Sequence, residues 1–224
     1  MAIDVIGDAP SLAAIDSDHP IAEKTVGTQG VPTCCLQDFR ELYDGLPFIS
    51  VSMSLLGSIA VTATNLVSKD IGFPSELMQS STVAAPLYSQ DCGYGTNIPS
   101  PMRMQLTVDT IEFCSKKMPH SYPFIEDTYY ISEAGLDSVE EIGLGLIEAR
   151  AIIDELLNRG LGIDEFAGRI AILVTARMGF FEEIAKLRAL RRMWARMMKE
   201  EYKAKRYRSL RPIITVHTSG LSLT

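Results

Sequence analysis

The chain has 224 residues, of which 46% are hydrophobic and 22% are charged, and its formal net charge is −7. This composition is ordinary for a globular protein that buries a core, and no apolar run reaches the ~18 residues that a membrane-spanning helix needs. The N-terminus lacks the basic and then apolar pattern of a secretory signal, so we expect no membrane partner.

Cysteine and histidine usage argues against a metal centre. The cysteines form no Cys-x-x-Cys pair, which disfavours a zinc or disulfide framework and favours reduced thiols in the cytoplasm or an organelle matrix. They are Cys34, Cys35, Cys92 and Cys114. The histidines are scattered, so we expect no metal site among them. They are His19, His120 and His217.

One block of the sequence is basic. Residues 186–211 contain eleven Lys and Arg against two Glu, and such a block can contact nucleic acid. Trp194 and several methionines interleave with the basic residues at helical spacing, and basic residues late in a helix also complement its dipole. We therefore interpret the block as the solvated face of a helix and expect no nucleic-acid partner.

The first part of the chain alternates between strand and helix patterns. An N-terminal arm over about 1–45 precedes a β-branched strand over 48–54 and a helix near 57–70. A short strand follows over 76–83. The segment 88–101 is rich in Gly, Pro and small polar residues, which predicts a long loop, and loops of that length are often functional.

The same alternation continues to the end of the chain. The further predicted elements are a helix over 102–118, a strand over 123–131, a helix over 132–159, a strand over 169–176, a helix over 180–204 and a strand over 212–218. The strand over 169–176 is almost entirely apolar, as a strand buried on both faces should be. Gly160 is a natural stop for the helix before it.

Five strands separated by helices predict an α/β fold in which the strands pair in parallel through right-handed crossovers. Either an open doubly wound sheet or part of an eight-fold barrel satisfies this pattern. No Gly-x-Gly-x-x-Gly follows a strand and no Gly-x-x-x-x-Gly-Lys-Ser/Thr occurs, so the two commonest nucleotide-binding loops are absent.

Candidate functional residues lie where the strand over 123–131 meets the following helix. Tyr129 and Tyr130 should point to opposite faces if the strand continues through them. Glu133 falls in the first turn of the predicted helix, where the helix dipole alone favours a carboxylate. Because ligands of parallel α/β folds bind at strand C-terminal ends, the three residues are candidates for a binding site.

Two further candidates belong to the last strands. Arg169 begins the buried strand over 169–176, and an arginine in such a place needs an anionic partner such as a phosphate or a carboxylate. His217 lies at the end of the strand over 212–218, at the edge where parallel α/β folds contact ligands.

Several stretches together resemble the barrel of the methylmalonyl-CoA mutase family, the adenosylcobalamin-dependent acyl-CoA mutases. The matching stretches are "DSDHPIAEKTVGTQGV" (16–31), "LYDGLPFISVSMSLLGSIA" (42–60), "YYISEAG" (129–135), "GLGIDEFAGRIAI" (160–172), "FFEEIAKLRALRRMWARMM" (180–198) and "TSGLSLT" (218–224). They follow the family's order along nearly the whole chain.

The resemblance implies a (βα)₈ TIM-type barrel whose channel threads the CoA ester, with adenosylcobalamin across the strand C-termini. It implies a radical 1,2-rearrangement of an acyl-CoA ester for which the cofactor supplies the difficult chemistry. By position, Gln79 and Tyr129 match substrate-contacting residues. Glu133 matches a glutamate near the adenosyl group, and Arg169 matches an arginine that binds the CoA ester.

Departures from the family pattern bear on the substrate. Tyr130 stands where the family has a histidine that hydrogen-bonds the thioester carbonyl, which makes Tyr130 the candidate catalytic residue. His120 replaces an expected lysine, and His217 replaces an expected glutamine. The arginine that pairs with a substrate carboxylate has no counterpart in 88–101. These departures favour a CoA ester without a free carboxylate over methylmalonyl-CoA, or no turnover.

The resemblance covers only a partial barrel of about five βα units over 46–224. The family's first barrel strand and its cobalamin-binding domain have no counterpart, so a missing segment or a partner chain is expected to supply them. Five units would leave open parallel edges. We expect the substrate-binding part of a mutase. The alternatives are a catalytically silent subunit that partners a complete mutase and a CoA-ester binding module.

Overall fold

The structure is a computed structural model, and it describes residues 3–46, 50–54, 57–84, 86–87 and 98–220. The chain divides into two compact units, Met1–Phe124 and Ile125–Thr224. Within the described residues, no helix combines the length and the apolar character that crossing a membrane requires.

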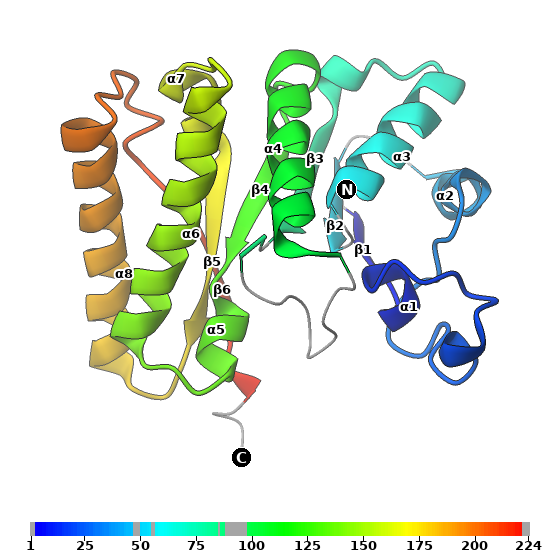
Figure 1. Cartoon of the computed structure of the whole chain (residues 1–224), viewed down its shortest axis with the longest axis horizontal. Coiled ribbons are helices and arrows are strands. Elements are labelled where there is room, and N and C mark those ends of the chain that lie inside the picture. Colours follow the sequence, from blue (N-terminus) through cyan, green and yellow to red (C-terminus); the bar gives the residue numbers. More distant parts are fainter. Residues whose placement is uncertain (1–2, 47–49, 55–56, 85, 88–97, 221–224) are drawn as a thin grey trace. The chain divides into compact units, whose positions relative to one another are not determined.

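Strands and helices alternate along the chain (Figure 1). The strands are β1 (Ile3–Ile6), β2 (Ser50–Ser54), β3 (Gln79–Ala84), β4 (Tyr122–Asp127), β5 (Ile170–Ala176) and β6 (Ile213–Thr218). The helices are α1 (Ala9–Leu12), α2 (Leu36–Tyr43), α3 (Gly57–Asp70), α4 (Ser100–Lys117), α5 (Tyr129–Glu133), α6 (Ser138–Asn158), α7 (Ile163–Phe166) and α8 (Phe180–Arg196). Short helical turns are η1 (Pro20–Ala22), η2 (Ser75–Leu77), η3 (Ala167–Arg169) and η4 (Met197–Glu201).

Neighbours in the sheet are also neighbours in the chain. In the first unit β1 pairs with β2 and β2 with β3, both in parallel. In the second unit β5 and β6 are parallel, and the backbone N–H of Thr128, just after β4, donates to Leu173 of β5. A doubly wound sheet reverses its strand order at a switch point, whereas a (βα)₈ barrel keeps it sequential. The fold is α/β with parallel strands in barrel order, which confirms the expected partial TIM-type barrel.

The Met1–Phe124 unit buries one apolar cluster between its strands and the helices α2, α3 and α4. Its members are Val5, Phe39, Tyr43, Val51, Met53, Ala60, Val61, Ala63, Val67, Met78, Cys114 and Met118. Gly30 lets its own loop pass close to Gly7, the residue directly after β1. A Cβ on residue 30 would lie 2.4 Å from the carbonyl oxygen of Gly7. Only glycine permits that approach.

The Ile125–Thr224 unit is built on β5, whose first six residues are buried as predicted for an apolar strand. Helices α6 and α8 lie side by side in this unit (Figure 1). Asp137 caps α6 by accepting from Val139 and Glu140, which forms a capping box with Glu140. A Cβ on Gly145 would lie 2.3 Å from Cγ2 of Thr128, so glycine is what lets α6 approach the end of β4.

Two boundary predictions were wrong. The strand predicted over 123–131 ends at Asp127, so Tyr129 and Tyr130 belong to α5 and do not alternate across a strand. The helix predicted from residue 132 is two helices, because Gly135 has a φ of +102°, which ends α5. Glu133 is therefore the last residue of α5 and does not lie in the first turn of a long helix.

Other predictions agree more closely. The helix expected near 57–70 is α3 (Gly57–Asp70), and each of the five predicted strands has a counterpart. A sixth strand, β1, lies within the region 1–45 that the sequence indicated only as an arm. Arg169 closes η3 directly before β5 instead of starting the strand. Most of the loop predicted over 88–101 lies outside the described residues.

Candidate functional site

Three aromatic rings meet at the C-terminal ends of β4 and β6. Tyr129 opens α5 just after β4, and His217 is the next-to-last residue of β6. Their ring centroids are 5.1 Å apart at an interplanar angle of 81°. The ring centroid of Tyr130 lies 5.2 Å from that of Tyr129, at an interplanar angle of 77°. Edge-to-face packing of this kind holds the rings in defined orientations.

Glu133 joins this cluster through the segment that follows β6. Its Oε1 accepts a hydrogen bond of 2.7 Å from the Ser219 hydroxyl, and Ser219 is buried. A Cβ on Gly220 would lie 3.4 Å from Oε2 of Glu133 and 3.7 Å from the Tyr129 hydroxyl. The carboxylate and the phenol therefore flank the same backbone position, and together they offer an acceptor and a donor to a ligand.

Arg177 fastens α5 to the end of β5. Its Nη2 donates to the carbonyl oxygen of Ser132 at 2.9 Å, to the Ser132 hydroxyl at 2.5 Å, and to the carbonyl oxygen of Leu136. A guanidinium that bridges several acceptors is a rigid clamp. Arg177 thus holds in place the short helix that carries Tyr129, Tyr130 and Glu133.

A buried polar network contacts Thr128, the residue directly before α5. Glu141 of α6 accepts from the Thr128 hydroxyl at 3.1 Å and from the Thr175 backbone N–H at 2.8 Å. The other carboxylate oxygen of Glu141 lies 2.9 Å from Nζ of Lys186, and the side chains of Glu141 and Lys186 are both fully buried. Lys186 also contacts Glu183 at 2.7 Å and donates to the Thr175 carbonyl at 2.5 Å. Each carboxylate oxygen of Glu141 has a partner, which fixes the Lys186 ammonium group between α6 and β5.

Arg169 lies at the other end of β5. Its side chain is buried, with 6% of the residue exposed, and Nη2 donates to the Glu165 carbonyl at 3.0 Å. β5 has seven residues, and at ~3.3 Å per residue the strand separates Arg169 from its C-terminal end by about 20 Å. The structure therefore does not bring Arg169 together with the aromatic cluster.

Gln79 and His120 belong to the Met1–Phe124 unit. Gln79 is the first residue of β3 and is exposed, and His120 is exposed in the turn before β4. Both lie at the N-terminal ends of their strands, whereas Tyr129, Glu133 and His217 lie at C-terminal ends. The sequence predicted substrate contacts for Gln79, His120, Tyr129 and His217 and a cofactor contact for Glu133, without this distinction between strand ends.

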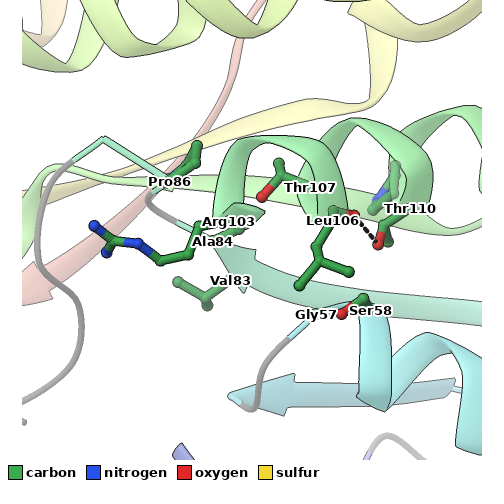
Figure 2. A pocket seen from close by; sticks show the side chains of 10 residues that line it. Gly57, Ser58, Val83, Ala84, Pro86, Arg103, Leu106, Thr107 and Thr110 are labelled. Atoms are coloured by element: carbon green, nitrogen blue, oxygen red, sulfur yellow. Dashed lines mark hydrogen bonds between the residues drawn. The ribbon is translucent and has the colours of Figure 1, made fainter. Parts of the chain in front are cut away.

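The first unit has a small pocket at the C-terminal end of β3 (Figure 2). The start of α3, the end of β3, one face of α4 and Pro123 of β4 line it, and its volume of about 20 Å³ has room for about one water molecule. Arg103 extends along one side of it, while Thr110 donates to the Leu106 carbonyl at 2.7 Å. The sequence gave no indication of this pocket.

Sequence reasoning also missed Ser219 and Arg177. Ser219 stands in "TSG", one of the stretches that carried the family resemblance, yet its contact with Glu133 spans 86 positions. Arg177 follows an apolar strand and carries no local signal of its role. Contacts between distant segments of this kind become visible only once the strand ends are placed.

Comparison with known proteins places the chain in a family. Residues 1–224 match the family methylmalonyl-CoA mutase. A methylmalonyl-CoA mutase of Rhizobium meliloti is 34% identical over 99% of this chain and 32% of its own length. The mutase of Cereibacter sphaeroides is 33% identical over 99% and 32%, and the mitochondrial mutase of Homo sapiens is 31% identical over 99% and 30%. The chain spans about a third of the length of these curated relatives. It belongs to the methylmalonyl-CoA mutase family.

Proposed function

We propose that this chain forms the substrate-binding part of an adenosylcobalamin-dependent mutase that rearranges the carbon skeleton of an acyl-CoA ester. The observation that carries the proposal is the cluster of Tyr129, Tyr130, Glu133 and His217 at the strand C-terminal ends of one unit. Active sites of TIM-type barrels are built at this edge. Family membership supports the reaction class.

Within this proposal the aromatic residues hold the acyl thioester. Tyr130 donates a hydrogen bond to the thioester carbonyl, in place of the family's histidine, and Tyr129 packs beside the acyl group. His217 supports Tyr129 through their ring contact. A tyrosine hydroxyl can donate such a bond, although it is far less acidic than an imidazolium.

Arg169 is proposed to bind the CoA portion, far from the acyl group. The length of β5 between Arg169 and the cluster suits an extended ligand whose reacting end lies at the C-terminal edge. Gln79 and His120 are proposed as further substrate contacts, and their place at strand N-terminal ends favours the CoA end over the thioester.

The residues at the C-terminal edge fit the adenosyl portion of the cofactor. Glu133 presents a carboxylate fixed by Ser219, and a fixed carboxylate accepts hydrogen bonds from sugar hydroxyls. When bound, adenosylcobalamin supplies an organic radical from its carbon–cobalt bond. We propose that a missing segment or a partner chain provides the cobalt ligand.

We infer a substrate without a free carboxylate. Tyr130, His120 and His217 differ from the residues expected for methylmalonyl-CoA. None of the three offers a permanent positive charge to pair with a free carboxylate of the substrate. We also infer a cytoplasmic or organelle-matrix location, which the free, exposed thiols of Cys34 and Cys35 support.

The test is to combine the chain with adenosylcobalamin, a panel of acyl-CoA esters and the remaining part of a mutase relative. Cob(II)alamin absorbance should develop with an ester that lacks a free carboxylate. Absence of this absorbance in every combination would rule out the enzyme proposal.

The same observations leave a second candidate, a catalytically silent subunit that partners a complete mutase. The replacement of the family's histidine by Tyr130 favours it, because a weaker hydrogen-bond donor to the thioester would slow the reaction. A CoA-ester binding module is the third candidate. CoA-ester binding without any cobalamin signal would support the binding module, and association with a complete mutase without CoA-ester binding would support the silent subunit.

A further inference from the structure

A second pocket of the Met1–Phe124 unit is lined by the start of α2, one face of α3 and Leu106 of α4. Its volume is about 460 Å³, and small-molecule sites in proteins typically measure ~300–1,000 Å³. The adjacent residues Cys34 and Cys35 belong to its lining, so we refer to it as the thiol pocket. It takes no part in the proposed substrate site, whose aromatic cluster belongs to the other unit.

The walls of the thiol pocket suit a hydrocarbon chain. The apolar side chains that line it are Leu36, Phe39, Ile59, Ala63, Leu66 and Leu106. Ile59, Ala63 and Leu66 follow one another at i, i+4 and i+7, so they share one face of α3. Ile59 is 46% exposed and Leu66 39% exposed, which leaves apolar surface for a ligand to cover. Among the described residues that line the pocket, none is charged.

The two cysteines are held in place at this pocket. Both are exposed free thiols. The Asp38 carboxylate, in the first turn of α2, accepts from the Cys34 N–H at 2.6 Å and from the Cys35 N–H at 2.9 Å. Hydrogen bonds to a carboxylate are stronger than those between neutral groups. The backbone that carries both thiols is therefore fixed against the start of α2.

The two sulfurs differ in their surroundings. Cys34 Sγ accepts from the Ser17 N–H at 3.3 Å and lies 2.8 Å from the Ser17 hydroxyl. These contacts occupy the Cys34 sulfur. Cys35 is the N-cap residue of α2 and directly precedes Leu36, which belongs to the apolar wall. Cys35 is thus the thiol better placed to react with a molecule whose chain lies in the pocket.

We propose that Cys35 is an S-acylation site and that the thiol pocket holds the acyl chain of a fatty acyl thioester. The Cys35 sulfur attacks the thioester carbonyl of a fatty acyl-CoA. A new sulfur–carbon bond forms, the bond between the acyl carbon and the CoA sulfur breaks, and the proton of the Cys35 thiol passes to the departing CoA sulfur. No oxidant or further reactant is needed. The proposal rests on the proposed function only for the identity of the acyl donor.

The test is incubation of the full chain with octanoyl-CoA or acetyl-CoA, without cobalamin. Intact mass spectrometry follows the rate of acylation, peptide mapping locates the acyl group, and neutral hydroxylamine identifies it as a thioester. Cys35→Ser removes the acceptor, and Cys34→Ser is its matched control. Ile59→Gln makes the wall of the pocket polar. Its control is Ile71→Gln, at a residue directly after α3 that is 59% exposed and does not line the pocket. Circular dichroism reports the folding of each variant.

The proposal predicts a hydroxylamine-labile octanoyl group on Cys35 in the wild-type chain and in Cys34→Ser, and none in Cys35→Ser. Octanoyl transfer should be at least about tenfold faster than acetyl transfer, because the longer chain is buried in the pocket. Ile59→Gln should slow octanoyl transfer about fivefold and leave acetyl transfer unchanged, whereas Ile71→Gln should change neither.

Four results would overturn the proposal. They are the absence of an adduct, an adduct on another residue, equal rates for the two esters, and equal octanoyl rates for Ile59→Gln and Ile71→Gln. Equal rates for the two esters would show the chemistry of an exposed thiol without a binding pocket. Because neither cobalamin nor the aromatic cluster takes part, failure here is distinguishable from failure of the proposed function.

Discussion

Tyr130 is the residue whose identity separates this chain most clearly from the family pattern. It begins α5 together with Tyr129 and packs edge-to-face against that ring. Its hydroxyl can donate one hydrogen bond, but the imidazole that it replaces is a better proton donor near neutral pH. Under the proposed function, activity at the thioester is expected to depend on this position more than on any other in the cluster.

The first prediction concerns this position. Tyr130→His should increase turnover of the accepted acyl-CoA ester by about tenfold, because a stronger donor would face the thioester carbonyl. The measurement is kcat/KM in an assembly that shows activity. Tyr207→His, at a tyrosine that is 75% exposed, should leave it unchanged. Equal rates for wild type and Tyr130→His would remove Tyr130 from its catalytic role.

A second residue-scale feature is the carboxyl of Glu126, buried at the end of β4. Burial, and then the charge of the equally buried Glu148, raises the pKa of Glu126 well above its ordinary value of 4.5. The folded state therefore holds this proton more tightly than the unfolded state does. The resulting stabilisation is complete below pH 4.5 and is lost as pH rises through the folded-state pKa.

The second prediction follows from the raised pKa of Glu126. The free energy of unfolding of the wild-type chain should fall between about pH 5 and pH 8, and Glu126→Gln should show a smaller fall because its amide does not ionise. Urea denaturation at the two pH values measures the difference. Glu76→Gln, at an exposed carboxyl, serves as the control. An identical pH dependence in all three proteins would show that Glu126 does not titrate as described.

At the scale of elements, Lys186 links α8 to α6 and β5. Its ammonium group is fully buried and contacts Glu141, Glu183 and the Thr175 carbonyl. Removal of one member of such a network leaves a buried charge without compensation. Since Glu141 also accepts from Thr128, the network holds the turn that leads into α5.

The third prediction tests this link. Lys186→Met should lower the free energy of unfolding by about 3–5 kcal/mol, because the Glu141 carboxylate would stay buried without its cation. Arg188→Met, at an exposed position of the same helix, should change it by less than about 0.5 kcal/mol. Urea unfolding curves of the two variants decide the matter. A loss below 1 kcal/mol for Lys186→Met would contradict the described coupling.

Much of the element order could be predicted from periodicity. The apolar run of β5 and the Gly160 stop after α6 are strong local signals, and both agree with the structure. The end of β4 was missed because "DTYYIS" contains β-branched and aromatic residues that favour a strand. Other contacts end the strand at Asp127. The Thr128 hydroxyl donates to the Leu173 carbonyl, and the Asp127 carboxylate accepts from the Tyr129 N–H.

The candidate site was predictable only in part. Tyr129, Glu133 and His217 could be placed at one edge because they follow or end parallel strands. The Ser219 and Arg177 contacts depend on where distant strand ends meet. The pocket beside Arg103 likewise requires four separate elements, α3, β3, α4 and β4, to be placed. Local sequence patterns carry no information on such contacts.

At the scale of the whole molecule, the chain corresponds to about a third of its curated relatives. Parallel strands in barrel order leave terminal edges that need cover, and β6 is exposed on both faces. The aromatic cluster and Glu133 lie at the C-terminal ends of the strands in the Ile125–Thr224 unit.

The most direct test of the central claim is an equilibrium titration with CoA compounds of the full chain, both alone and mixed with the remaining part of a mutase relative. Butyryl-CoA, whose acyl group has no free carboxylate, should bind more tightly than methylmalonyl-CoA and free CoA. His217→Ala should weaken that binding by about tenfold through loss of support for Tyr129. If no CoA compound binds in either setting, or if methylmalonyl-CoA binds most tightly, the account of this chain as the substrate-binding part of a mutase for such esters is wrong.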